Sequence, residues 1–205
     1  AAGFLWELQA SDLPLKIEDH MRFMPSLMEQ LGPSAYIIGG GVWYEPYVFS
    51  PNRERRSFFW GRDSAGTLEF VADYNDPRGA GYHQEEWYVP GRFLPPNEVF
   101  WSRSYMDPHT YVPMVTCTVP IHRKDRFVGV VTVDLKLAGI EAFFEGEAAK
   151  MGSYAFAVDR NGTFLSFPDV PLTQNRYRDK FGHQHVAYIQ AVELAARQPD
   201  RKSVV

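Results

Sequence analysis

The feature that most constrains the fold is a pair of apolar segments, residues 111–121 and 127–135, joined by a short charged stretch. In the first segment, Val115, Cys117 and Val119 alternate with more polar residues. Alternation with a period of two is typical of β-strands, and two such segments with a short polar connection predict a hairpin. We therefore expect an antiparallel sheet built around this hairpin.

The second strand of the hairpin carries a carboxylate among valines. Successive side chains of a strand point to opposite faces, so the residues expected on one face are Val128, Val130, Thr132 and Asp134. If Asp134 is buried it must be paired, because an unpaired buried carboxylate is strongly destabilising. It is therefore either a solvated or capping group, or a binding group whose partner is a ligand ammonium.

The other elements place the chain in the α+β class. Residues 15–31 have apolar side chains at a spacing near 3.6, which predicts a helix that Pro25 breaks or kinks. Residues 35–44, around three glycines, predict a strand. Further strands are expected at residues 58–60, 68–72, 154–158 and 163–167, and further helices at residues 82–93, 137–151 and 186–197. This order favours an antiparallel sheet with flanking helices, followed by the start of a second module with few strands.

Composition excludes several classes of protein. The 205 residues carry a net charge of −4 with no basic stripe, so no nucleic-acid partner is expected. The single cysteine, Cys117, cannot form an intrachain disulfide. No apolar run approaches the roughly 20 residues of a membrane span, so membrane attachment would come from segments outside this sequence. His183 and His185 lack a third ligand at fixed spacing, and neither a metal nor another cofactor is expected.

Motifs for catalysis are missing from the sequence. It contains no nucleophile elbow, no His-Glu-x-x-His pair, no phosphate loop and no dinucleotide-binding glycine pattern. No catalytic residue is assigned, and the chain is interpreted as a binding module. Two alternatives stay open: a structural spacer domain without a ligand, and a small periplasmic hydrolase, since a catalytic carboxylate pair is invisible in sequence.

Five segments in order resemble the double-Cache family, the PAS-like extracytoplasmic sensor domains of bacterial receptors. They are residues 41–46, 86–88, 101–107, 114–116 and 129–135. Residues 152–162 resemble the first hairpin of the family's membrane-proximal module. The resemblance implies an N-terminal helical segment at residues 1–33, a membrane-distal ligand-binding module at 34–149 and a partial proximal module at 150–205.

The resemblance also implies a function and a location. Such a domain senses a small molecule in the periplasm, as part of an inner-membrane receptor of the histidine kinase, chemoreceptor, cyclase or phosphatase type. It performs no chemistry on its ligand. The N-terminal helix is a natural face for a homodimer.

Amino-acid-binding members of the family have a Tyr, an Arg and a Trp-Tyr pair on one helix, and an Asp on the last strand. Trp87 and Tyr88 match the pair, and Asp134 matches the strand Asp that holds the ligand's amino group. The Arg position falls on Glu85, and the Tyr position falls near Ala80 or Tyr82. The implied ligand-binding residues are Tyr82, Glu85, Trp87, Tyr88, Trp101, Tyr105, Asp107 and Asp134.

The substitution at the Arg position bears on ligand charge. Glu85 would repel a carboxylate, and with Asp107 and Asp134 it would make the site acidic. Aromatic faces attract cations by roughly 0.5 to 2 kcal/mol each. The sequence therefore predicts a small cationic or neutral polar ligand, such as an amine. In the alternative, Glu85 faces solvent and one of Arg62, Arg92 and Arg103 supplies a carboxylate clamp.

Overall fold

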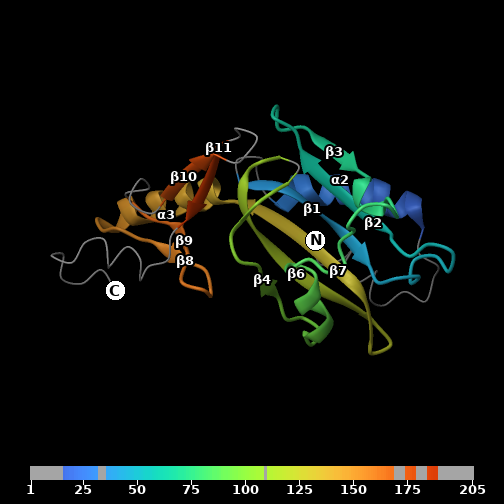
Figure 1. Ribbon diagram of the computed structural model, residues 1–205. Coiled ribbons are helices and arrows are strands. Elements are labelled where there is room, and N and C mark those ends of the chain that lie inside the picture. Colours follow the sequence, from blue (N-terminus) through green and yellow to red (C-terminus); the bar gives the residue numbers. More distant parts are fainter. Residues whose placement is uncertain (1–15, 32–35, 109, 169–173, 179–183, 189–205) are drawn as a thin grey trace. The chain divides into compact units, whose positions relative to one another are not determined.

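The computed structural model describes residues 16–31, 36–108, 110–168, 174–178 and 184–188 (Figure 1). The chain divides into two compact units. The first comprises residues 1–102 and 116–135, and the second comprises residues 103–115 and 136–205. No helix in the described ranges is both long and apolar enough to cross a membrane.

The first unit is built on an antiparallel sheet with the strand order β3-β2-β1-β7-β6-β4. The strands are β1 (Ile37–Tyr44), β2 (Ser57–Arg62), β3 (Leu68–Val71), β4 (Phe100–Trp101), β6 (Pro113–Arg123) and β7 (Arg126–Lys136). β5 (Tyr105–Met106) pairs with the first residues of β6, and both of these paired segments belong to the second unit. The predicted α+β class and antiparallel sheet are confirmed.

The β6–β7 hairpin predicted from the sequence is present, and its strand β7 pairs with β1 in the middle of this sheet. Its loop is Lys124 and Asp125, with φ angles of 47° and 61°. Two central residues with positive φ define the type I′ turn, whose twist matches that of the flanking strands. The alternation is interrupted at Gly129, where φ is 153°. Val128 consequently packs in the same core cluster as Val131, so its predicted place on the face of Asp134 is wrong.

Helix α2 (Ile17–Leu31) covers one face of the sheet and contributes Met24 and Leu27 to the main core. The helix continues through Pro25 to Leu31, so the expected break at this proline does not occur. The core cluster consists of Met24, Leu27, Val42, Tyr44, Phe58, Trp60, Ile121, Val128 and Val131. Gly40 lets the helix approach the sheet, because a Cβ there would lie 2.8 Å from the sulfur of Met28.

The prediction of one helix over residues 82–93 is wrong. The structure has successive turns over residues 82–88, and only the short 3₁₀ helix η2 (Val89–Phe93) follows. The backbone N–H of Glu85 donates to the carbonyl of Tyr82, and that of Tyr88 to the carbonyl of Glu85. Pro90 has no backbone N–H to donate to a helical hydrogen bond. The aromatic side chains of this segment pack against Trp43 and do not line up on one face of a helix.

The second unit contains α3 (Leu137–Met151), which matches the predicted helix and ends at Gly152 with a left-handed φ of 61°. Two hairpins follow, formed by β8 (Ala157–Val158) with β9 (Phe164–Ser166) and by β10 (Gln174–Arg178) with β11 (Gln184–Tyr188).

The predicted helix at residues 186–197 is wrong at residues 186–188, which lie in β11. A short apolar pattern does not by itself separate a strand from a helix. The rest of that helix, like residues 1–15 of the N-terminal segment, lies outside the described residues. The module boundary at residue 149 stays a prediction.

Candidate ligand-binding site

The sheet of the first unit has a second face, opposite α2. Along β1, Val42 and Gly40 point to the helix, so Gly39, Gly41 and Trp43 point the other way. The β1–β7 register places Asp134 opposite Gly39 and Thr132 opposite Gly41, on this same face. We call it the aromatic face and define it by Gly39, Gly41, Trp43, Phe59, Thr116, Thr132 and Asp134.

Asp134 is the carboxylate of the aromatic face, with only 6% of its surface exposed. Its Oδ1 accepts a hydrogen bond of 2.7 Å from the hydroxyl of Thr116 on β6. Its Oδ2 lies 3.1 Å from the position that a Cβ of Gly39 would occupy. Burial and the charge of Asp134 raise the pKa of the neighbouring Cys117 thiol to about 11. The missing side chain at residue 39 thus leaves room for a buried carboxylate in a fixed position.

Trp43 is the centre of an aromatic cluster on this face. Its indole Nε1 donates to the hydroxyl of Thr132 at 2.8 Å, which fixes the ring against β7. Four rings surround it with centroid distances of 4.7 to 5.2 Å, namely Phe59, Tyr74, Tyr82 and Trp87. A buried carboxylate and a set of aromatic rings therefore occupy one face of one sheet.

The predicted Trp-Tyr pair divides between two roles. Trp87 packs on Trp43, and its backbone carbonyl accepts a bond of 2.7 Å from the hydroxyl of Thr118. The hydroxyl of Tyr88 donates to Oε1 of Glu45 at 2.7 Å, and Nε of Arg92 donates to the same oxygen at 2.8 Å. Tyr88 therefore anchors its segment to the residue that follows β1.

Tyr82 also combines a ring in the cluster with a structural hydroxyl. The hydroxyl donates to the carbonyl of Tyr44 at 2.7 Å and accepts from the backbone N–H of Arg56 at 3.1 Å. Burial raises the pKa of this phenol well above its ordinary value. Tyr82 therefore ties its segment to the end of β1 and to the start of β2.

The other predicted residues have different surroundings. Glu85 is exposed, and Trp101 on β4 is 47% exposed. Tyr105 and Asp107 belong to the second unit. There Asp107 is buried, and its Oδ2 accepts from the backbone N–H and the hydroxyl of Thr110. The aromatic face itself thus contains Asp134 and contacts two more of the predicted residues, Tyr82 and Trp87.

Sequence reasoning did not assign Trp43, Phe59 or Tyr74 to the site. A signal for Trp43 was present, since it shares its strand face with Gly39 and Gly41 and lies in a segment that resembles the family. Tyr74 reaches the cluster from the segment after β3, and no period or motif marks that position.

Two of the three arginines considered as carboxylate clamps are engaged elsewhere in the first unit. Arg62 points to the α2 side, where it donates to the carbonyls of Ile37 and Gly66 and pairs with Glu29 at 3.0 Å. Arg92 pairs with Glu45, as described above. Arg103 belongs to the second unit. Neither Arg62 nor Arg92 therefore contributes a guanidinium to the aromatic face.

Comparison with known proteins identifies the family. The model for the first PDC sensor domain of methyl-accepting chemotaxis protein-like receptors matches residues 23–142, more than half of the chain. The chain belongs to this family. It is also 30% identical over 100 residues to the methyl-accepting chemotaxis protein McpC of Bacillus subtilis (strain 168). That match covers 49% of this chain but only 14% of McpC.

Solved structures show the same fold. The extracellular domain of mmHK1S-Z3, described as a histidine kinase, matches with a TM-score of 0.62 at 15% identity, over 99% of this chain and 89% of that one. The ligand-binding domain of the amino acid chemoreceptor PctC of Pseudomonas aeruginosa PAO1, in complex with GABA, matches with a TM-score of 0.55 at 15% identity, over 100% of this chain and 73% of that one.

These findings confirm the resemblance stated from the sequence. The fold is the PAS-like fold of Cache and PDC sensors, and the chain is an extracytoplasmic sensor domain of a signalling receptor. Membership in a family of sensors supports the interpretation of this segment as a binding module.

Proposed function

We propose that the first unit binds a small organic cation, a primary amine, on its aromatic face, and that its receptor responds to this ligand. The observation that most supports this proposal is the buried carboxylate of Asp134, which lies on the same sheet face as the Trp43 cluster. A sensor domain needs a group whose free energy changes when the ligand binds. A buried charge is such a group, because its free energy depends strongly on the partners that it contacts.

The chemistry of this face favours an ammonium group. A carboxylate can accept several hydrogen bonds, so the bond from Thr116 is compatible with further bonds from a ligand. Hydrogen bonds between two charged partners are about twice as strong as neutral ones. The faces of Trp43 and Trp87 would add cation–π attraction of roughly 0.5 to 2 kcal/mol each.

Two observations bear on the other end of the ligand. PctC was crystallised with GABA, which combines an ammonium with a carboxylate. In this chain Arg62 and Arg92 are engaged with Glu29 and Glu45. We therefore infer that a ligand carboxylate gains little on this face, and that an amine binds better than an amino acid of equal length.

Calorimetry with three compounds of equal chain length tests this proposal. Butylamine carries the ammonium alone, GABA carries both groups, and butyrate carries the carboxylate alone. We expect butylamine to bind best and butyrate not to bind, and Asp134→Asn to weaken butylamine at least about tenfold through loss of a charged partner. Asp125→Asn is the control, because it removes a carboxylate from the turn before β7, and Asp134 lies near the other end of that strand. Binding of GABA in preference to butylamine, or equal binding by Asp134→Asn, would contradict the proposal.

For the whole receptor, we propose that residues 34–149 form the membrane-distal ligand-binding module and that α2 provides a homodimer face. Ile17 and Met21, one helical turn apart, are each more than 40% exposed on α2. Exposed apolar residues at this spacing are typical of a helix–helix contact.

A further inference from the structure

One segment of the first unit lies against the aromatic face. Residues 72–82, which we call the strap, follow β3 and include the short 3₁₀ helix η1 (Asp73–Asn75). Tyr74 and Tyr82 of the strap pack edge-on against Trp43, at 5.0 and 5.2 Å between ring centroids. The opposite side of the strap, residues 77–80, is exposed. The strap is therefore a thin cover between solvent and the Trp43 cluster.

The side chain of Asn75 fastens the strap at one point. Its Oδ1 accepts from the backbone N–H of Ser57 at 2.6 Å, and its Nδ2 donates to the carbonyl of Ser57 at 3.0 Å. The amide thus pairs with the first residue of β2 as another strand would. Ser57 is fully buried, so these two bonds satisfy backbone groups that water does not reach.

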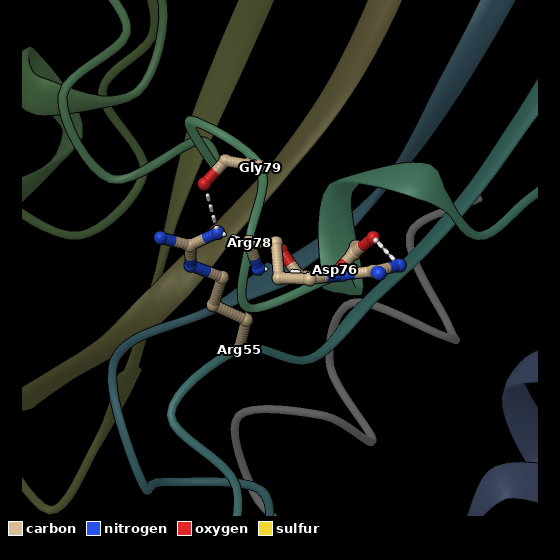
Figure 2. A network of polar contacts seen from close by, with 4 residues as sticks. All are labelled: Arg55, Asp76, Arg78 and Gly79. Carbon is tan, nitrogen blue, oxygen red and sulfur yellow. Dashed lines mark hydrogen bonds and ion pairs between the residues drawn. The ribbon is translucent and has the colours of Figure 1, made fainter.

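Arg55 fastens the strap at a second point, two residues before Ser57. Its Nη1 donates to the carbonyl of Asp76 at 2.8 Å and to that of Gly79 at 2.7 Å. Figure 2 shows the guanidinium reaching Gly79, with the pair of Arg78 and Asp76 beside it. A Cβ at Gly81 would lie 2.7 Å from Cζ of Arg55, so this position must be a glycine for the guanidinium to lie there.

We propose that Arg55 and Asn75 form a latch that holds the strap closed over the aromatic face and sets the rate at which a ligand reaches it. The ligand part of this inference rests on the proposed function. The bond from Arg55 to Gly79 is exposed, so water can replace it, whereas the bond to Asp76 is partly buried. Tyr74 and Tyr82 block access to Trp43 only as long as the strap is closed. The two side chains are positioning residues, and neither needs to touch the ligand.

Hydrogen exchange of the ligand-free protein tests the latch directly. We expect backbone amides of residues 72–82 to exchange about tenfold faster or more in Arg55→Met and in Asn75→Ala, because each change removes hydrogen bonds to the strap. Arg78→Gln is the matched control. Arg78 pairs with Asp76 inside the strap and is 89% exposed, so its removal should leave the exchange unchanged. Arg55→Lys, with one compact donor head in place of the fork, should be intermediate and guards against unfolding of Arg55→Met.

A ligand experiment separates the latch from the proposed function. Stopped-flow tryptophan fluorescence with butylamine should show association and dissociation both faster in Arg55→Met, with the dissociation constant changed by less than about threefold, since the latch does not touch the ligand. Unchanged exchange in both latch variants would overturn the latch whatever butylamine does. Faster exchange with unchanged association rates would also overturn it, because the strap would not lie on the entry route. Absence of butylamine binding to the wild type contradicts the proposed function, and the exchange result then decides the latch alone.

Discussion

The hydroxyl of Tyr44 on β1 lies 2.6 Å from Nε2 of His20 on α2, and both side chains are almost completely buried. Nδ1 of His20 lies 2.7 Å from the carbonyl oxygen of Lys16. A carbonyl only accepts, so Nδ1 carries a proton, and in the neutral ring, which burial favours by lowering the pKa of His20, Nε2 accepts from Tyr44. The imidazole also stacks on Phe58 at 4.3 Å. The neutral ring is thus the form that joins the helix to the sheet.

This arrangement predicts that the domain loses stability in mild acid. Burial is the main cause that lowers the pKa of His20 from its ordinary value of 6.5, and it outweighs the hydrogen bond to Lys16 and the charge of Asp19, which raise this pKa. The unfolded chain therefore takes up the proton first as the pH falls. The contribution of the neutral ring is complete above the ordinary pKa and is lost as the pH falls from there through the folded pKa.

Urea unfolding between pH 7.5 and 5 measures this loss. A single such group contributes a slope of at most about 1.4 kcal/mol per pH unit. The variant His20→Gln should show a flatter profile, since glutamine does not titrate. An equal slope in wild type and variant would assign the effect to other groups, among them His83, whose pKa burial also lowers.

Replacement by alanine should change the stability of the domain in opposite directions at two glycines whose surroundings differ. At Gly40, a Cβ would lie 2.5 Å from the backbone oxygen of Thr132 and 2.8 Å from the sulfur of Met28, so Gly40→Ala should destabilise by about 1 to 3 kcal/mol. At Gly146 in α3, a Cβ would meet nothing within 4 Å, and Gly146→Ala should stabilise by roughly 0.5 to 1 kcal/mol. Denaturant midpoints of the two variants check both signs, and a loss of stability in both would contradict the second prediction.

The exposed side of α2 predicts self-association. Replacing Met21 by Glu places a charge beside Ile17 without touching the buried Met24 and Met28. If α2 forms the dimer face, sedimentation should show a dimer for the wild type and a monomer for Met21→Glu. Replacement of the exposed Phe143 of α3 by Glu is the control and should keep the dimer. A wild type that stays monomeric at high concentration would contradict the prediction.

The sequence predicted those parts of the fold that follow from local periodicity. The strands β6 and β7 are eleven residues long each, and both this hairpin and the helix α3 were found within two residues of their expected ends. The segment of residues 82–93 was misjudged because its aromatic side chains follow tertiary partners, such as Trp43, and no helical face. Asp134 was singled out through its strand face and the family pattern, and its role in binding stays a prediction. Tyr74 could not be predicted, because its place in the cluster depends on the bonds that join Asn75 and Asp76 to Ser57 and Arg55, which are distant in the sequence.

The neighbourhood of Asp134 gives the most specific test of the binding site. Gly39→Ala adds a Cβ at 3.1 Å from Oδ2 of Asp134 and at 3.0 Å from the backbone oxygen of Trp60. The backbone of β2 is held by its strand pairs, so the carboxylate is the group that shifts by a few tenths of an ångström. We expect butylamine binding to weaken several-fold while the urea midpoint changes little, because charge-assisted hydrogen bonds depend steeply on geometry. Cys117→Ala, beside Thr116 on β6, is the control and should bind as the wild type does. If Gly39→Ala binds butylamine unchanged while Asp134→Asn loses binding, the ligand contacts the other oxygen of Asp134, which accepts from Thr116. Thr116→Val should then change the affinity for butylamine by more than Gly39→Ala does.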